Sequence, residues 1–96
     1  MNDISIDQIK QRALPILKKA GATKSAIFGS AARGEMSDDS DIDIIIDLPK
    51  GSSLFDLIDV QSELEKELNN EVDLITYNGM NKYVEPYILK DQVSIL

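Results

Sequence analysis

Residues 29–43 read GSAARGEMSDDSDID, and this stretch separates two apolar segments of the chain, Ala26–Phe28 before it and Ile44–Ile46 after it. Glycine lets backbone N–H groups approach a bulky anion, and Ser30, directly after Gly29, can cap a following helix. The start of the stretch therefore predicts a strand, a phosphate-binding turn and a short helix, in that order.

Two aspartates, Asp41 and Asp43, lead into the second apolar segment. Alternate side chains of a strand point to one face, so both carboxylates are expected on the same side of a sheet. Such a pair is repulsive unless it is solvated, shares a proton or binds a cation, and oxygen ligands suit Mg²⁺ or Mn²⁺. The alternative, two ordinary polar residues at a sheet edge, leaves the cost of aspartates in a strand unexplained.

Taken alone, Gly29 and Ser30 would indicate only a strand-to-helix turn with a serine cap. Followed after a ten-residue spacer by Asp-x-Asp, they resemble the signature of the DNA polymerase β-type nucleotidyltransferase superfamily. Within that superfamily the chain resembles the minimal nucleotidyltransferases, or MNT proteins. The matching segments are Gly29-Ser30-x-Ala32-Arg33-Gly34 and Ser40-Asp41-Ile42-Asp43.

The resemblance implies an α+β nucleotidyltransferase (polymerase β-like) fold, with a small mixed sheet and helices, in one minimal domain over residues 1–96. It implies the antitoxin of a HEPN–MNT toxin–antitoxin pair. Such a protein would transfer AMP from ATP to a tyrosine hydroxyl of its HEPN toxin, as an EC 2.7.7-class protein adenylyltransferase. The implied partner is the HEPN toxin, in a hetero-oligomer with this chain.

The resemblance also assigns metal-binding and catalytic roles to three carboxylates. Asp41 and Asp43 would hold two Mg²⁺ ions, with Mn²⁺ as a possible substitute. The superfamily's third carboxylate maps to Asp73, which would ligate the metal next to the acceptor hydroxyl and could take its proton.

The remaining site residues contact the nucleotide. Gly29 and Ser30 would bind the β- and γ-phosphates of ATP through backbone N–H groups, the hydroxyl and the helix N-terminus. Arg33 either contacts phosphate or braces the acidic loop, and the sequence does not decide between these roles.

Periodicity and turn residues place the other elements along the chain. The first helix begins after Ser5 and ends at Gly21, with a kink or a break into two helices at Pro15. The later predictions are strands at 24–28, 41–47 and 71–76, a short helix from 30 to 34, a turn and cap at 51–53 followed by a helix to about 69, a turn at 78–79 and a short helix around 86.

Connection lengths predict how these strands pair. The short link between the first two strands makes them antiparallel, which would place Gly29 beside Asp41. The helix between the second and third strands makes that pair parallel, and brings Asp73 beside Asp41 and Asp43 on the same face.

For two apolar segments the sequence allows two interpretations. The helix after residue 53 predicts one buried apolar stripe, with Phe55 outside it as a boundary core residue or, alternatively, a partner contact. The tail Val93–Leu96 predicts either an edge strand or a docking segment. The stripe consists of Leu54, Leu57, Ile58, Leu64 and Leu68.

Composition limits the chemistry. The net charge of -7 argues against direct nucleic-acid binding, which needs a basic surface, and favours a basic partner. The absence of cysteine and histidine excludes thiolate and histidine-dependent nucleophilic sites. A chain without cysteine is typical of a cytoplasmic protein. No apolar run approaches a membrane span. With 96 residues, a second substrate-binding domain has no room, which favours a macromolecular acceptor.

Two rival functions remain open at this point. The chain could be a binding-only antitoxin that neutralises the HEPN toxin by complex formation. It could instead be a nucleotidyltransferase that acts on a small molecule.

Overall fold

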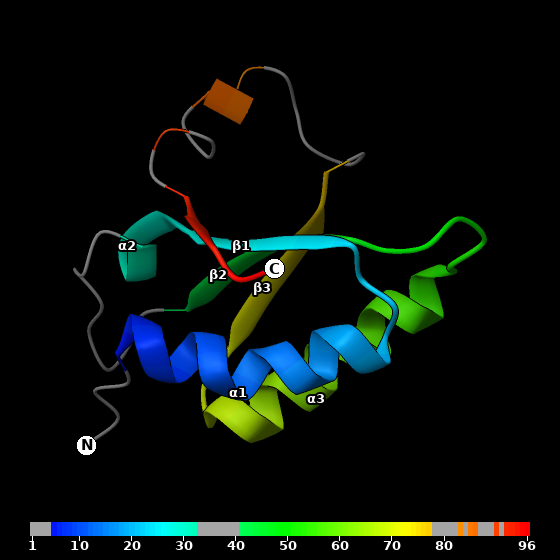
Figure 1. Cartoon of the computed structure of the whole chain (residues 1–96), viewed down its shortest axis with the longest axis horizontal. Helices are drawn as coiled ribbons and strands as arrows, with labels where there is room; N and C mark the ends of the chain where they lie inside the picture. The colour runs from blue at the N-terminus through cyan, green and yellow to red at the C-terminus, as the bar shows by residue number, and fades with distance from the viewer. Residues whose placement is uncertain (1–4, 33–40, 78–82, 84, 87–89, 91) are drawn as a thin grey trace.

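The computed structural model describes residues 5–32, 41–77, 83, 85, 86, 90 and 92–96, with only the backbone of residues 30 and 31. A four-stranded mixed sheet carries two long helices on one face, an α+β arrangement (Figure 1). In chain order the elements are α1 (Ile6–Lys19), β1 (Lys24–Phe28), α2 (Gly29–Ala32), β2 (Ile42–Asp47), α3 (Leu54–Leu68), β3 (Val72–Thr76) and β4 (Val93–Ser94).

Helix α1 begins at a reciprocal cap. Ser5 Oγ accepts a hydrogen bond from the Gln8 backbone N–H at 3.2 Å, and the Ser5 N–H donates to Gln8 Oε1 at 3.0 Å. This capping box satisfies two donors that the first helical turn would otherwise leave free. Pro15 lies inside the continuous helix, so the alternative of two short helices is wrong.

The strand order is β3-β2-β1-β4. Strands β1 and β2 pair antiparallel, with Phe28 opposite Asp43, and β2 pairs parallel with β3, with Ile42 opposite Val72. Both pairings confirm the predictions made from connection length.

The core lies between the sheet and the two long helices. Every second residue of the central strands points into it, as the strand period requires, and burying one such isoleucine contributes about 1.5–3 kcal/mol. The sheet supplies Ile27, Ile42, Ile44, Ile46, Val72 and Leu74, and the helices supply Ile9, Ala13, Leu17, Val60, Leu64 and Leu68.

Helix α3 differs from its prediction in the first two turns. Leu64 and Leu68 are buried as expected, but Leu54 is 69% exposed and Ile58 is 47% exposed, so the single buried stripe is wrong at these two positions. Phe55 is 77% exposed, which contradicts its interpretation as a boundary core residue. Figure 1 shows the reason, because the first turn of α3 extends beyond the end of α1.

The C-terminal tail forms an edge strand. Val93 and Ser94 pair antiparallel with β1, and the Ile95 N–H donates to the Ser25 carbonyl at 2.8 Å. The edge-strand alternative is therefore confirmed. The predicted turn at 78–79 lies outside the described residues, as do most positions of the helix expected around Pro86.

Among the helices of the described residues, none combines the length and the apolar character that a membrane crossing requires.

Candidate active site

Three strand ends meet at one edge of the sheet. The antiparallel β1–β2 pairing puts the end of β1 beside the start of β2, and the parallel β2–β3 pairing puts the start of β3 on the other side. The chemistry-bearing residues of the sequence come from these three ends. This carboxylate edge, defined by Gly29, Asp41, Asp43 and Asp73, is the candidate active site.

Asp43 and Asp73 are direct partners in the parallel register. Paired residues of adjacent strands share one face, at a strand spacing of about 4.8 Å, so both carboxylates lie on the face opposite the long helices. Asp43 is half-buried and Asp73 is exposed. The prediction that Asp73 arrives beside Asp43 is confirmed, whereas the catalytic role of either residue stays a prediction.

Asp41 lies just before β2 and has a neighbour that the sequence analysis missed. The Ile42 N–H donates to the Glu71 carbonyl at 2.9 Å, which fixes the backbone of Glu71 next to Asp41. A hydrogen bond with the Asp41 carboxyl, followed by repulsion from its charge, raises the pKa of Glu71. The signal was available, because Glu71 precedes β3 as Asp41 precedes β2.

Gly29 packs against one of these carboxylates. Its φ of +72° lies in the left-handed region, and a Cβ there would clash with Asp43 Oδ2 and lie 3.2 Å from Asp43 Cγ. No residue with a side chain fits this position without moving Asp43. We predicted Gly29 beside Asp41. The register aligns Phe28 with Asp43, and the side chain nearest to the missing Cβ of Gly29 is that of Asp43, the other aspartate of the pair.

The other predicted nucleotide contacts are described only in part. The Ser30 backbone belongs to α2, while its side chain and the whole of Arg33 lie outside the described residues. The expected short helix is present from Gly29 to Ala32.

The donor chemistry of the edge suits a hard divalent cation, since carboxylate oxygens are the ligands that Mg²⁺ prefers. The missing Cβ of Gly29 leaves space beside Asp43. Within the described parts of the chain, however, no three acidic side chains are arranged closely enough to enclose an ion by themselves. Phosphate oxygens and water are ligands that could complete the coordination.

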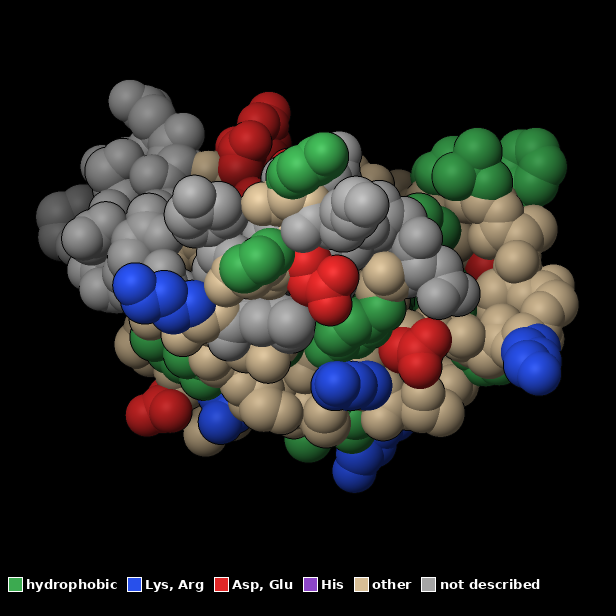
Figure 2. Space-filling view, turned by 90° about the horizontal axis from the view of Figure 1, so that it is seen from above, with side chains coloured by type: hydrophobic (Ala, Val, Ile, Leu, Met, Phe, Trp, Pro, Cys, Tyr) green, Lys and Arg blue, Asp and Glu red, His purple; other side chains and the backbone are tan. Residues whose placement is uncertain are grey.

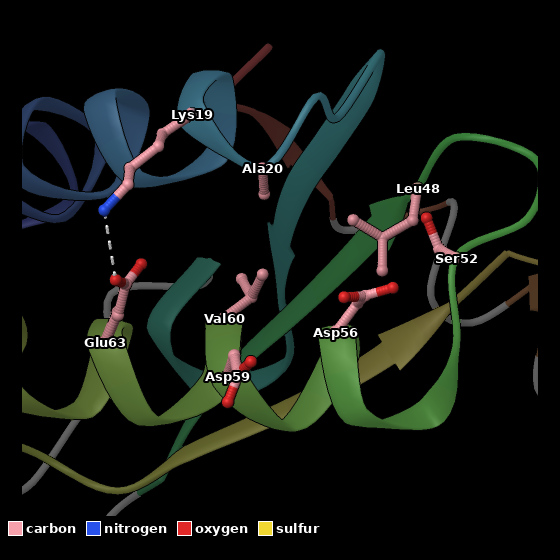
Figure 3. Close-up of a pocket in the computed structure, with 8 residues that line it drawn as sticks. All are labelled: Lys19, Ala20, Leu48, Ser52, Asp56, Asp59, Val60 and Glu63. Atoms are coloured by element: carbon pink, nitrogen blue, oxygen red, sulfur yellow. Dashed lines mark ion pairs between the residues drawn. The ribbon is translucent and has the colours of Figure 1, made fainter.

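Two hollows lie away from this edge. One, of about 400 Å³, lies between the end of α1 and α3 (Figure 3). Its acidic residues Asp56, Asp59 and Glu63 oppose triphosphate binding, and Lys19 Nζ is 3.5 Å from Glu63. The other, of about 670 Å³, is lined by the far ends of β2 and β3. Neither contains a residue of the carboxylate edge.

Comparison with protein families identifies the fold lineage. The polymerase β nucleotidyltransferase family model matches residues 11–96. The chain belongs to this family. Its membership confirms the polymerase β-like α+β fold and the nucleotidyltransferase class predicted from the sequence.

Curated relatives cover nearly the whole chain. A Methanocaldococcus jannaschii protein named as a candidate protein adenylyltransferase, MJ0435, is 42% identical over 97% of this chain and 100% of its own length. The protein adenylyltransferase MntA of Thermococcus cleftensis is 31% identical over 81% of this chain and 79% of its own.

Solved structures share the fold. A candidate minimal nucleotidyltransferase has a TM-score of 0.82 at 26% identity, covering 94% of this chain and 95% of its own. A toxin–antitoxin structure with AMP-PNP has a TM-score of 0.80 at 17% identity, covering 91% of this chain and 72% of its own. An MNT antitoxin bound to the tri-AMPylated Shewanella oneidensis HEPN toxin gives 0.74 at 14% identity, over 94% and 71%.

The contact between Gly29 and Asp43 predicts a difference between two glycine substitutions. Gly51 has a similar φ of +88° but open space around its missing Cβ, so Gly51→Ala should cost only backbone strain, about 1–2 kcal/mol. Gly29→Ala should cost more and should weaken Mg²⁺–ATP binding about tenfold or more, because it displaces the Asp43 carboxylate. Denaturant unfolding and calorimetric titration measure the two effects. Equal losses in both variants would contradict a specific contact.

The pair of Asp41 and Glu71 predicts a pH-dependent stability change. Because folding raises the Glu71 pKa, this residue lowers stability above that pKa, and the penalty disappears as the pH falls below the unfolded-state value. Without divalent cations, Glu71→Gln should therefore raise the Tm at pH 7 and leave it nearly unchanged at pH 4. Glu67→Gln, an exposed substitution on α3, is the control. A lower Tm for Glu71→Gln at pH 7 would contradict a repulsion between Asp41 and Glu71.

Proposed function

We propose that this chain is an antitoxin that transfers AMP from ATP to a tyrosine hydroxyl of a cognate HEPN toxin. The observation that carries the proposal is the in-register pairing of Asp43 with Asp73, with Gly29 against Asp43. The names of the relatives support AMP transfer to a protein, and the AMPylated HEPN toxin in complex with an MNT antitoxin supports the acceptor. The structure with AMP-PNP supports ATP as the donor.

Each residue of the site would have a role that follows from its position. The turn at Gly29 and Ser30 would orient the β- and γ-phosphates so that the α-phosphorus faces the acceptor. The tyrosine oxygen would form a bond to the α-phosphorus as the bond to the β-phosphate oxygen breaks, and pyrophosphate would leave. Asp73, on the exposed side of the edge, would accept the hydroxyl proton.

Asp41 and Asp43 would hold two divalent cations, either Mg²⁺ or Mn²⁺. When bound, these ions would neutralise triphosphate charge and lower the pKa of the acceptor hydroxyl. Phosphate oxygens would complete a ligand set that the described carboxylates do not complete alone.

The exposure of the edge favours a macromolecular acceptor. Asp41, Glu71 and Asp73 are all exposed, and the two hollows elsewhere do not reach them. An acceptor that brings its own surface can close this open side and exclude water from the reaction. A tyrosine presented on a protein meets that requirement.

Intact-mass measurement of the HEPN toxin tests the proposal. After incubation with this chain, ATP and Mg²⁺, the toxin should gain one or more adenylyl groups. Asp41→Asn with Asp43→Asn should lower the transfer rate on the order of 10²–10³-fold or more, since charge stabilisation at the phosphates is lost. Glu67→Gln, which removes an exposed carboxylate from the last turn of α3, should transfer AMP normally.

Two outcomes would overturn this assignment. If the native chain binds the toxin and neutralises it without any mass change, and the double variant does the same, the protein is a binding-only antitoxin. If the toxin stays unmodified while a free aminoglycoside is adenylylated, the acceptor is a small molecule.

A further inference from the structure

The first two turns of α3 carry an exposed apolar surface. Phe55, Leu54 and Ile58 are 77%, 69% and 47% exposed. Leu54 is four residues before Ile58 and Phe55 is three residues before it, spacings that make side chains neighbours on a helix surface. We call these three residues the α3 surface. Figure 2 shows hydrophobic side chains protruding together at the end of the molecule where α3 begins. Grouped apolar side chains of this size mark protein-binding sites more often than isolated ones do.

The α3 surface borders a hollow at the end of the sheet. This hollow, of about 670 Å³, is lined by Leu54 and Leu57 from α3 and by Asp47 and Thr76, which end β2 and β3. The carboxylate edge lies at the opposite end of the same strands, about 17 Å away along β2. A side chain from another protein can fill the hollow without touching the nucleotide site.

The exposure follows from how α3 lies beside the outer strand β3. Near the carboxylate edge, Gln61 Nε2 donates to the Val72 carbonyl at 2.9 Å, and the Val72 N–H donates to Glu65 Oε2 at 3.1 Å. These side chains cap the free edge of β3. One and two turns earlier the same flank of α3 carries Ile58 and Leu54, which cannot form such bonds. Contact with another protein would cover these exposed apolar side chains.

Charge indicates what kind of protein would bind there. Acidic side chains line the neighbouring face of α3, where Figure 3 shows Asp56, Asp59 and Glu63 along the helix. The whole chain has a net charge of -7, so a second copy would bring a like-charged rim to this surface. A partner with an apolar centre and a basic rim is complementary in both respects.

We infer that the α3 surface is the docking site for the protein acceptor of the proposed reaction, bound through an apolar segment flanked by lysine or arginine. This inference rests on the proposed function for the identity of the acceptor. Docking and chemistry then occur at opposite ends of the sheet. The acceptor must therefore reach around the molecule, or present its tyrosine from another subunit of its own oligomer.

The test measures toxin binding and AMP transfer with matched variants. Phe55→Ala with Ile58→Ala should raise the Kd for the HEPN toxin about tenfold or more, because a few large side chains supply most of the binding energy of an interface. Below saturation AMP transfer should fall in proportion, while the rate at saturating toxin stays unchanged. Tyr83→Ala, which removes another aromatic side chain that is 77% exposed, should leave the Kd unchanged.

A charge reversal tests the basic rim. Asp59→Lys, beside the α3 surface, should weaken toxin binding and reduce its dependence on salt. Glu67→Lys, on the last turn of α3, makes the same charge change away from the surface and should have little effect. Thermal unfolding of each variant separates lost docking from lost folding.

Three results would overturn the inference. They are an unchanged Kd in the α3 variants, an equal loss in Tyr83→Ala, or a dimer of the native chain alone that the α3 variants dissociate. Failure of the proposed function has a different signature. The native chain would then bind the toxin through the α3 surface and transfer no AMP, whereas failure of docking alone leaves both binding and transfer intact in the α3 variants.

Discussion

Strands β2 and β3 run parallel because α3 carries the chain back across one face of the sheet before β3 begins. This pairing puts the starts of both strands at one edge, and its register aligns Asp43 with Asp73. Repulsion between such carboxylates would disfavour the arrangement in a purely structural protein. A divalent cation would relieve that repulsion, and a triphosphate would bind through the same cation, which links the fold to nucleotide chemistry.

Much of this fold was predictable from local pattern. The β1 prediction matches the observed strand, and both strand pairings followed from the lengths of the connections. The exact neighbour of Gly29 could not be predicted, because the register depends on where the antiparallel ladder starts, which the sequence of the spacer does not state. The sequence did not decide whether the C-terminal tail forms a strand, because an apolar tail pairs with whichever strand of the sheet has an open edge. Here that strand is β1.

The candidate site was predictable in its residue types and less so in its surroundings. Period-two alternation, together with the simplest parallel register, was enough to place Asp43 and Asp73 on one face. Glu71 was overlooked because it was considered only as a strand residue, although it interacts with Asp41 where the two parallel strands begin. Helical periodicity also treated Leu54 and Ile58 as core, because a period gives the direction of a side chain and not the length of the partner that covers it.

The proposed function depends most directly on where the cation and the triphosphate bind. A crystal structure with Mn²⁺ and a non-hydrolysable ATP analogue would answer it, because the anomalous signal of Mn²⁺ locates the ion directly. We expect Mn²⁺ against the carboxylates of Asp41 and Asp43, with the phosphates at the Gly29 turn. Mn²⁺ or the triphosphate bound in the hollow at the far ends of β2 and β3, with the carboxylate edge empty, would contradict it.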